Sequence, residues 1–180
     1  MIEATPRIAP HEGLEKTEGV GMGALTRLMV DDDISSRVLL KKFIQQYGTA
    51  GILEAECAGQ ALDLLRTQDV DVLITDLKMP DMDGSDFVWC LRRSEDKRLW
   101  RLPVVMVSVH DDPDHTGLSR DAGVNGFAAK SCSMNDFHLL VRRAVEEPRT
   151  YIDAPGYVGP DRRRKDKGAT LARRMGPRRK

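Results

Sequence analysis

The sequence contains little cysteine and no long apolar run. Its three cysteines, Cys57, Cys90 and Cys132, lie far apart without metal-ligand spacing, which indicates buried or free thiols in a reducing compartment. No apolar stretch approaches the roughly 18 residues of a membrane span. The first residues, Met-Ile-Glu-Ala-Thr-Pro, have neither the basic nor the apolar part of a secretion signal. We therefore expect a cytoplasmic protein.

Net charge is also absent, because 28 Lys and Arg balance 28 Asp and Glu. The charge is nevertheless unevenly distributed along the chain. Residues 151–180 contain ten Lys or Arg and three Asp, or about +7. Residues 1–24 carry about −2, which leaves about −5 for the middle of the chain. This asymmetry suggests a cation site in the middle and an interaction arm at the C-terminal end.

Three regions follow from composition and periodicity. Residues 1–24 contain Pro6, Pro10 and four glycines without apolar periodicity, so we predict a mobile leader. Residues 25–148 carry the periodic segments and are predicted to form one domain. Residues 149–180 are too polar and too few for an output domain, and we predict a disordered basic tail.

The middle region alternates short apolar runs with segments of helical period. We predict strands at residues 25–30, 52–57, 70–75, 102–109 and 124–129. We predict helices at residues 35–47, 60–68, 86–93, 114–122 and 134–147, the first of them N-capped by Asp33. Strands that alternate with helices of this length favour an α/β fold, a doubly wound five-stranded parallel sheet with helices on both faces.

Polar residues stand where the predicted strands end. The first strand ends in Asp31 and Asp32, the third in Asp76, the fourth in Ser108, and the fifth runs into Lys130. Ligands of such sheets bind beyond the carboxyl ends of the strands, so we expect these groups to converge. Close carboxylates repel one another unless a cation lies among them, and Mg²⁺ prefers oxygen ligands. Asp76 could then attack a phosphoryl group whose charge the metal and Lys130 neutralise, while Ser108 hydrogen-bonds a phosphoryl oxygen.

Four segments carry a resemblance to the receiver domains of bacterial two-component response regulators. They are the acids after the first strand, residues 71–84 (DVLITDLKMPDMDG), residues 103–108 (PVVMVS) and residues 126–130 (GFAAK). The order and the spacings resemble those of the family over residues 25–148. The resemblance implies a flavodoxin-like (βα)5 fold and a phosphoprotein that signals through a phosphorylation-dependent surface. It also implies no enzymatic activity beyond self-catalysed phosphoryl uptake and hydrolysis.

The same resemblance implies a role for each matching residue. Asp31 and Asp32 resemble the acidic pair that binds Mg²⁺, and Asp76 resembles the phosphorylated residue and a further metal ligand. The backbone carbonyl of Lys78 resembles the remaining protein ligand. Lys130 resembles the lysine that contacts the phosphoryl group. On activation, Ser108 would follow the phosphate and Phe127 would swing inward.

Two positions depart from the family pattern. Ser131 follows Lys130 where receivers usually have a proline in a cis peptide bond. A cis bond before serine costs about 3–4 kcal/mol, so we expect the loop after Lys130 to run differently. Val109 follows Ser108 where a small residue is common, which predicts narrower access to the phosphoryl group.

The partner implied by the resemblance is a histidine kinase or a histidine phosphotransfer protein, together with an unknown downstream protein. A first alternative is a magnesium-dependent phosphatase similar to the haloacid dehalogenases, in which Asp31 would be the nucleophile. A second is an adaptor that binds nucleic acid through its basic tail. Identifying the phosphorylated aspartate discriminates between the receiver, in which it is Asp76, and the phosphatase, in which it is Asp31.

Overall fold

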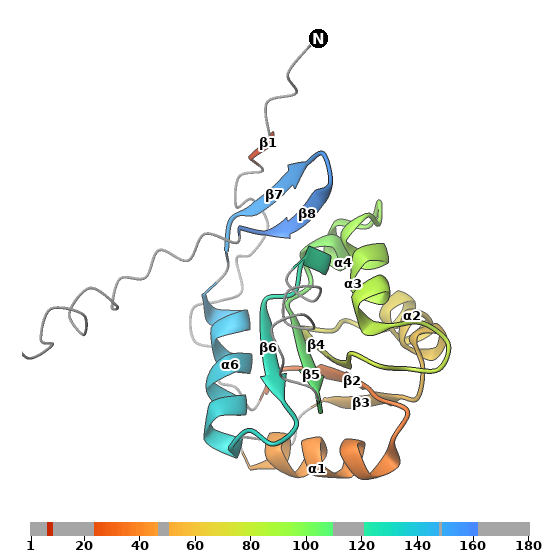
Figure 1. The fold of residues 1–180 in the computed structure, drawn as a ribbon, viewed down its shortest axis with the longest axis vertical. Helices are drawn as coiled ribbons and strands as arrows, with labels where there is room; N and C mark the ends of the chain where they lie inside the picture. The colour runs from red at the N-terminus through yellow and green to blue at the C-terminus, as the bar shows by residue number, and fades with distance from the viewer. Residues whose placement is uncertain (1–6, 9–23, 47–50, 110–120, 148, 162–180) are drawn as a thin grey trace, which may run out of the picture.

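A five-stranded parallel sheet with helices on both faces forms the body of the molecule (Figure 1). The computed structural model describes residues 7–8, 24–46, 51–109, 121–147 and 149–161. The strand order is β3-β2-β4-β5-β6. In chain order these strands are β2 (Arg27–Val30), β3 (Ile52–Ala55), β4 (Val72–Asp76), β5 (Val104–Ser108) and β6 (Gly126–Ala129). The predicted fold class is confirmed.

Helices in the described part of the chain cover both faces of this sheet. One core cluster packs α1 and α6 against the sheet, and the other packs α2 and α3 against the opposite face. The helices are α1 (Ile34–Gln45), α2 (Ala58–Thr67), α3 (Gly84–Arg92), α4 (Lys97–Arg101) and α6 (Met134–Glu146). Most of the predicted helix 114–122 lies outside the described residues. No helix in the described part of the chain is long and apolar enough to cross a membrane.

The three central strands explain where a site can form. Every residue of β2, β4 and β5 is buried. Burying one large apolar side chain contributes about 1.5–3 kcal/mol, so these runs fix the middle of the sheet. The chain leaves β2 toward β3 on one side and continues through β4 on the other, so the topological switch point lies between β2 and β4. The acids Asp31 and Asp76 flank that point.

Helix α4 is absent from the sequence-based prediction. It has five residues, and the carboxylate of its N-cap Asp96 accepts a hydrogen bond from the Arg98 N–H at 2.8 Å. So short a segment has no helical period for a pattern to reveal. A local cap therefore identifies this helix better than apolar spacing does.

A second, antiparallel sheet departs from the predicted domain boundaries. It consists of β1 (Arg7–Ile8), β7 (Tyr151–Ala154) and β8 (Tyr157–Pro160), in the order β1-β7-β8. Residues 149–161, which the sequence analysis assigned to a disordered tail, form a hairpin closed by Pro155 and Gly156. Gly156 has a φ of 84°, which suits glycine. The rest of the predicted tail, residues 162–180, lies outside the described residues, and its interaction role stays a prediction.

The hairpin packs on the amino-terminal ends of β5 and β6 (Figure 1). The buried Tyr151 hydroxyl donates to the Arg101 carbonyl at 3.1 Å, and the Arg92 guanidinium lies 5.4 Å from the centre of its ring. A Cβ at Gly159 would lie 2.9 Å from the Cα of Gly123, so the two backbones approach very closely. The hairpin is thus part of the folded body, at the end of the sheet opposite Asp31 and Asp76.

Candidate functional site

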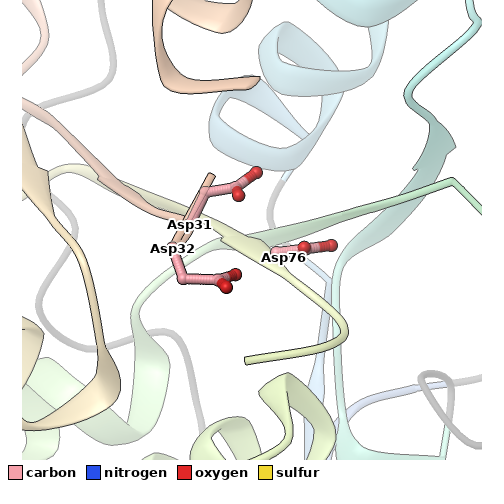
Figure 2. A group of neighbouring side chains, drawn as sticks. All are labelled: Asp31, Asp32 and Asp76. Atoms are coloured by element: carbon pink, nitrogen blue, oxygen red, sulfur yellow. The ribbon is translucent and has the colours of Figure 1, made fainter. Parts of the chain in front are cut away.

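Three acids meet at the carboxyl ends of β2 and β4 (Figure 2). One carboxylate oxygen each from Asp31, Asp32 and Asp76 lies within 4.8 Å of the others. Asp31 is fully buried and Asp76 is 9% exposed, whereas Asp32 is open to solvent. The strand register explains why Asp31 and Asp76 lie side by side. Val30 of β2 pairs with Thr75 of β4, and Asp31 and Asp76 are the residues that follow them. The structure therefore brings together the acids that the sequence singled out.

Lys130 extends from the end of β6 into this acidic group. Its Nζ lies 2.7 Å from Asp31 Oδ2 and 3.0 Å from Asp76 Oδ2. The Lys130 N–H also donates to the Ser108 carbonyl at 2.7 Å, which fixes where the side chain leaves the sheet. The described residues contain no cis peptide bond. Lys130 contacts both acids although Ser131 stands where the family usually has proline.

Burial and charge act in opposite directions on the two ionisable partners. Burial raises the pKa of Asp76 above its ordinary value, against the opposing effect of the Lys130 ammonium, and the nearby Asp31 adds to the rise. Burial works to lower the pKa of Lys130, but its close contacts with the carboxylates of Asp31 and Asp76 outweigh that and raise it. Lys130 is therefore charged at neutral pH and offsets part of the repulsion among the acids.

The donor set fits a hard divalent cation. Asp31 Oδ2 is buried and accepts no hydrogen bond of normal geometry, although the Lys130 ammonium pairs with it at 2.7 Å. Carboxylate oxygens at this spacing are the ligands that Mg²⁺ takes, usually together with water and phosphate oxygens. Lys78 lies two residues beyond Asp76, and its side chain turns away to pair with Asp83 at 3.0 Å.

The two remaining candidates line the neighbouring strands. Ser108 is the last residue of β5 and is 1% exposed. Phe127 lies in β6 opposite Met106, is half-buried, and packs against the core cluster that involves α2 and α3. Val109, for which we predicted an effect on access, is 68% exposed.

Arg37 braces the acidic loop and was missed by the sequence analysis. Its buried guanidinium donates to the backbone carbonyl of Asp31 at 2.7 Å and to that of Asp32 at 3.3 Å. It also pairs with Glu56 at 2.9 Å. Asp33 completes the brace: its N–H donates to Asp31 Oδ1 at 3.0 Å, and its carboxylate caps α1 as predicted. The only sequence signal for Arg37 is its place one helical turn after the acids.

Gly84 holds the loop that carries Asp76. Its N–H donates to the Leu77 carbonyl at 2.7 Å, and a Cβ on it would lie only 2.0 Å from the Asp76 backbone oxygen. The Leu77 N–H in turn donates to Asp76 Oδ1 at 2.7 Å. Because no other residue allows this approach, glycine at position 84 helps orient the Asp76 carboxylate.

Comparisons with known proteins agree with this geometry. Residues 28–142 match the family model described as "Response regulator receiver domain". The chain is 36% identical over 103 residues to the chemotaxis protein CheY of Pseudomonas aeruginosa, spanning 57% of this chain and 82% of that protein. A CheY homologue of Campylobacter jejuni is 36% identical over 104 residues, which span 57% of this chain and 78% of that protein.

Solved structures show the same fold. The structure of the chemotaxis response regulator CheY4 of Vibrio cholerae superposes with a TM-score of 0.60 at 25% identity, covering 67% of this chain and 98% of that chain. A putative response regulator from Chloroflexus aurantiacus gives a TM-score of 0.64 at 24% identity, covering 68% of this chain and 98% of that chain. The second likeness concerns the fold alone.

Proposed function

Because this chain belongs to the response regulator receiver domain family, we propose that it accepts a phosphoryl group on Asp76 with Mg²⁺ present. The observation that carries the proposal is the Asp76 carboxylate between the acids Asp31 and Asp32 on one side and the Lys130 ammonium on the other. A bond forms between an Asp76 oxygen and phosphorus as the bond from phosphorus to the donor breaks.

The chain's own groups prepare this transfer. Leu77 N–H and Lys130 Nζ each contact one Asp76 oxygen, at 2.7 Å and 3.0 Å, and so orient the carboxylate for in-line attack. Asp31, Asp32 and Asp76 would hold the metal ion, with the backbone carbonyl of Lys78 as a further proposed ligand. Bound there, Mg²⁺ would neutralise the charge on the transferring phosphoryl group.

The donor we propose is a histidine kinase or a histidine phosphotransfer protein. An apolar surface next to the acids supports docking of another protein there. Helix α1 exposes Ile34, Val38 and Leu39, which are 67%, 48% and 40% exposed, and Ile34 directly follows the acidic loop. Exposed apolar groups that cluster on one helix are typical of interaction surfaces.

Labelling tests the proposed reaction. Acetyl phosphate with Mg²⁺ is expected to add one phosphoryl group to the chain, detected by mass spectrometry and mapped to the peptide that contains Asp76. Without Mg²⁺ we expect the rate to fall by roughly a hundredfold, because the charge on the acids then repels the donor. Equal labelling with and without the metal contradicts the proposed metal site.

The output would pass through a change of surface around β6. We propose that a phosphoryl group on Asp76 draws Ser108 toward it and that Phe127 turns inward, which biases a two-state element. A beryllofluoride mimic is expected to shift the NMR signals of α6 and β6 as well as those near Asp76. Shifts confined to the neighbourhood of Asp76 would refute this switch without contradicting Asp76 as the phosphorylation site.

A further inference from the structure

The Lys130 ammonium has three contacts, and one of them involves a residue that the family resemblance does not assign. The ammonium forms an ion pair with the carboxylate of Asp31 at 2.7 Å. It donates a hydrogen bond to Asp76 Oδ2 at 3.0 Å. It donates another to the hydroxyl of Ser36, whose Oγ lies 3.0 Å from Nζ. Within the described residues, Ser36 is the only uncharged side chain to which this ammonium donates a hydrogen bond.

Ser36 has a fixed place beside the acids. It lies in the first turn of α1, where its N–H donates to the capping carboxylate of Asp33 at 3.4 Å. The next residue, Arg37, ties the same turn to the carbonyls of Asp31 and Asp32. The half-buried Ser36 hydroxyl therefore belongs to the same rigid unit as Asp31 and Asp32.

A contact with a hydroxyl differs in kind from the two contacts with carboxylates. A hard cation at the acids draws on the same oxygens that Lys130 now uses, because carboxylates are its preferred ligands. A neutral serine hydroxyl does not compete for that cation. The hydrogen bond to Ser36 can therefore keep the long Lys130 side chain in place when the carboxylates change partners, and spare the cost of ordering it again.

We propose that Ser36 is a positioning residue that holds the Lys130 ammonium beside Asp76 for phosphoryl transfer. This inference rests on the proposed function. Ser36 acts through Lys130, so its effect depends on the ammonium being there. The contact joins residues that are 94 positions apart, and it fastens α1 to the loop after β6 across the site.

The test compares three variants with acetyl phosphate at saturating Mg²⁺. Ser36→Ala is expected to lower the maximal rate of Asp76 labelling by about threefold to tenfold, which corresponds to the net contribution of one typical hydrogen bond. The acetyl phosphate concentration at half-maximal rate is expected to change by less than about twofold, because a loss confined to the transition state lowers the rate and not the binding. Ser36→Thr, which keeps the hydroxyl, is expected to restore most of the rate. Ser35→Ala removes the neighbouring exposed hydroxyl and is expected to label at the wild-type rate.

A double-mutant cycle separates a positioning role from a general structural one. In a Lys130→Met background, Ser36→Ala is expected to have no further effect on labelling. In the metal-free protein Ser36→Ala is expected to lower the thermal midpoint by about 2–4 °C, and by less than that when Lys130 is already replaced. If Lys130→Met fails to fold, the comparison of Ser36→Ala with Ser36→Thr, Ser35→Ala and wild type still decides.

The outcomes distinguish the two proposals. A wild-type chain that does not label at Asp76 overturns the proposed function. A wild-type chain that labels normally, with Ser36→Ala equal to it in rate and thermal midpoint, overturns the role of Ser36 alone. A loss in Ser36→Ala that persists undiminished in the Lys130→Met background shows that Ser36 does not act through Lys130.

Discussion

The Asp76→Asn variant is expected to take up no phosphoryl group from acetyl phosphate, a loss of roughly a hundredfold or more relative to wild type. A neutral amide is a poor nucleophile at phosphorus, and it also removes one of the three converging acids. The fold is expected to persist, because asparagine has the same shape and its Oδ1 can still accept the Leu77 N–H, although its amide nitrogen cannot accept from Lys130. Intact mass spectrometry after a timed reaction measures the loss.

Two comparisons make this result specific. Asp81→Asn changes an exposed acid in the same loop that lies outside the three-acid group, and we expect it to label at the wild-type rate. A label that maps to Asp31 would favour chemistry of the haloacid dehalogenase type, in which Asp31 is the nucleophile. Wild-type labelling of Asp76→Asn would show that the phosphoacceptor is another residue.

The sheet and the placement of the acids were accessible from sequence because both follow from local patterns. Strand β5 begins with a continuous apolar run, residues 104–107, which is typical of a strand buried on both faces. Ser108 ends this run. Parallel strands carry their carboxyl ends to one edge, so a polar residue after each run predicts a shared site. The convergence of Asp31, Asp76 and Lys130 needs no knowledge of loop conformation.

The braces around the site could not be predicted in this way, because they depend on side-chain geometry between distant residues. Nothing in the pattern of α1 shows that Ser36 meets Lys130 or that Arg37 spans two carbonyls. The hairpin was missed for a different reason. Its Pro155-Gly156 turn between two short apolar segments was a readable signal, but the basic residues that follow dominated the composition. The segment also depends on partners far away in sequence, chiefly Arg92 and Gly123.

Arg92 shows why that hairpin matters for stability. The guanidinium is 1% exposed and donates to the carbonyls of Gly123 at 3.0 Å and Leu102 at 2.9 Å, and to Asn125 Oδ1 at 3.2 Å. In the part of the chain that the structure describes, no carboxylate accepts a hydrogen bond from it, and the ring of Tyr151 faces it at 5.4 Å. Removing the hairpin would take away the Tyr151 ring that faces this guanidinium, so the hairpin should add to stability through a cation–π contact as well as through its buried area.

Ending the chain after Thr150 is therefore expected to lower the free energy of unfolding by about 3–6 kcal/mol. Burial of Tyr151 contributes about 1.5–3 kcal/mol, its hydrogen bond to Arg101 about 1 kcal/mol, and its cation–π contact with Arg92 about 0.5–2 kcal/mol. The matched control ends after Asp161, keeps each of these contacts, and is expected to change stability by less than about 0.5 kcal/mol. Urea unfolding of the two truncated chains measures the difference.

The chain that ends after Thr150 is still expected to take up a phosphoryl group on Asp76 at temperatures where the sheet stays folded, because the acids lie at the opposite end of the strands. Equal stability of the two truncated chains would mean that the hairpin covers Arg92 without supporting the domain.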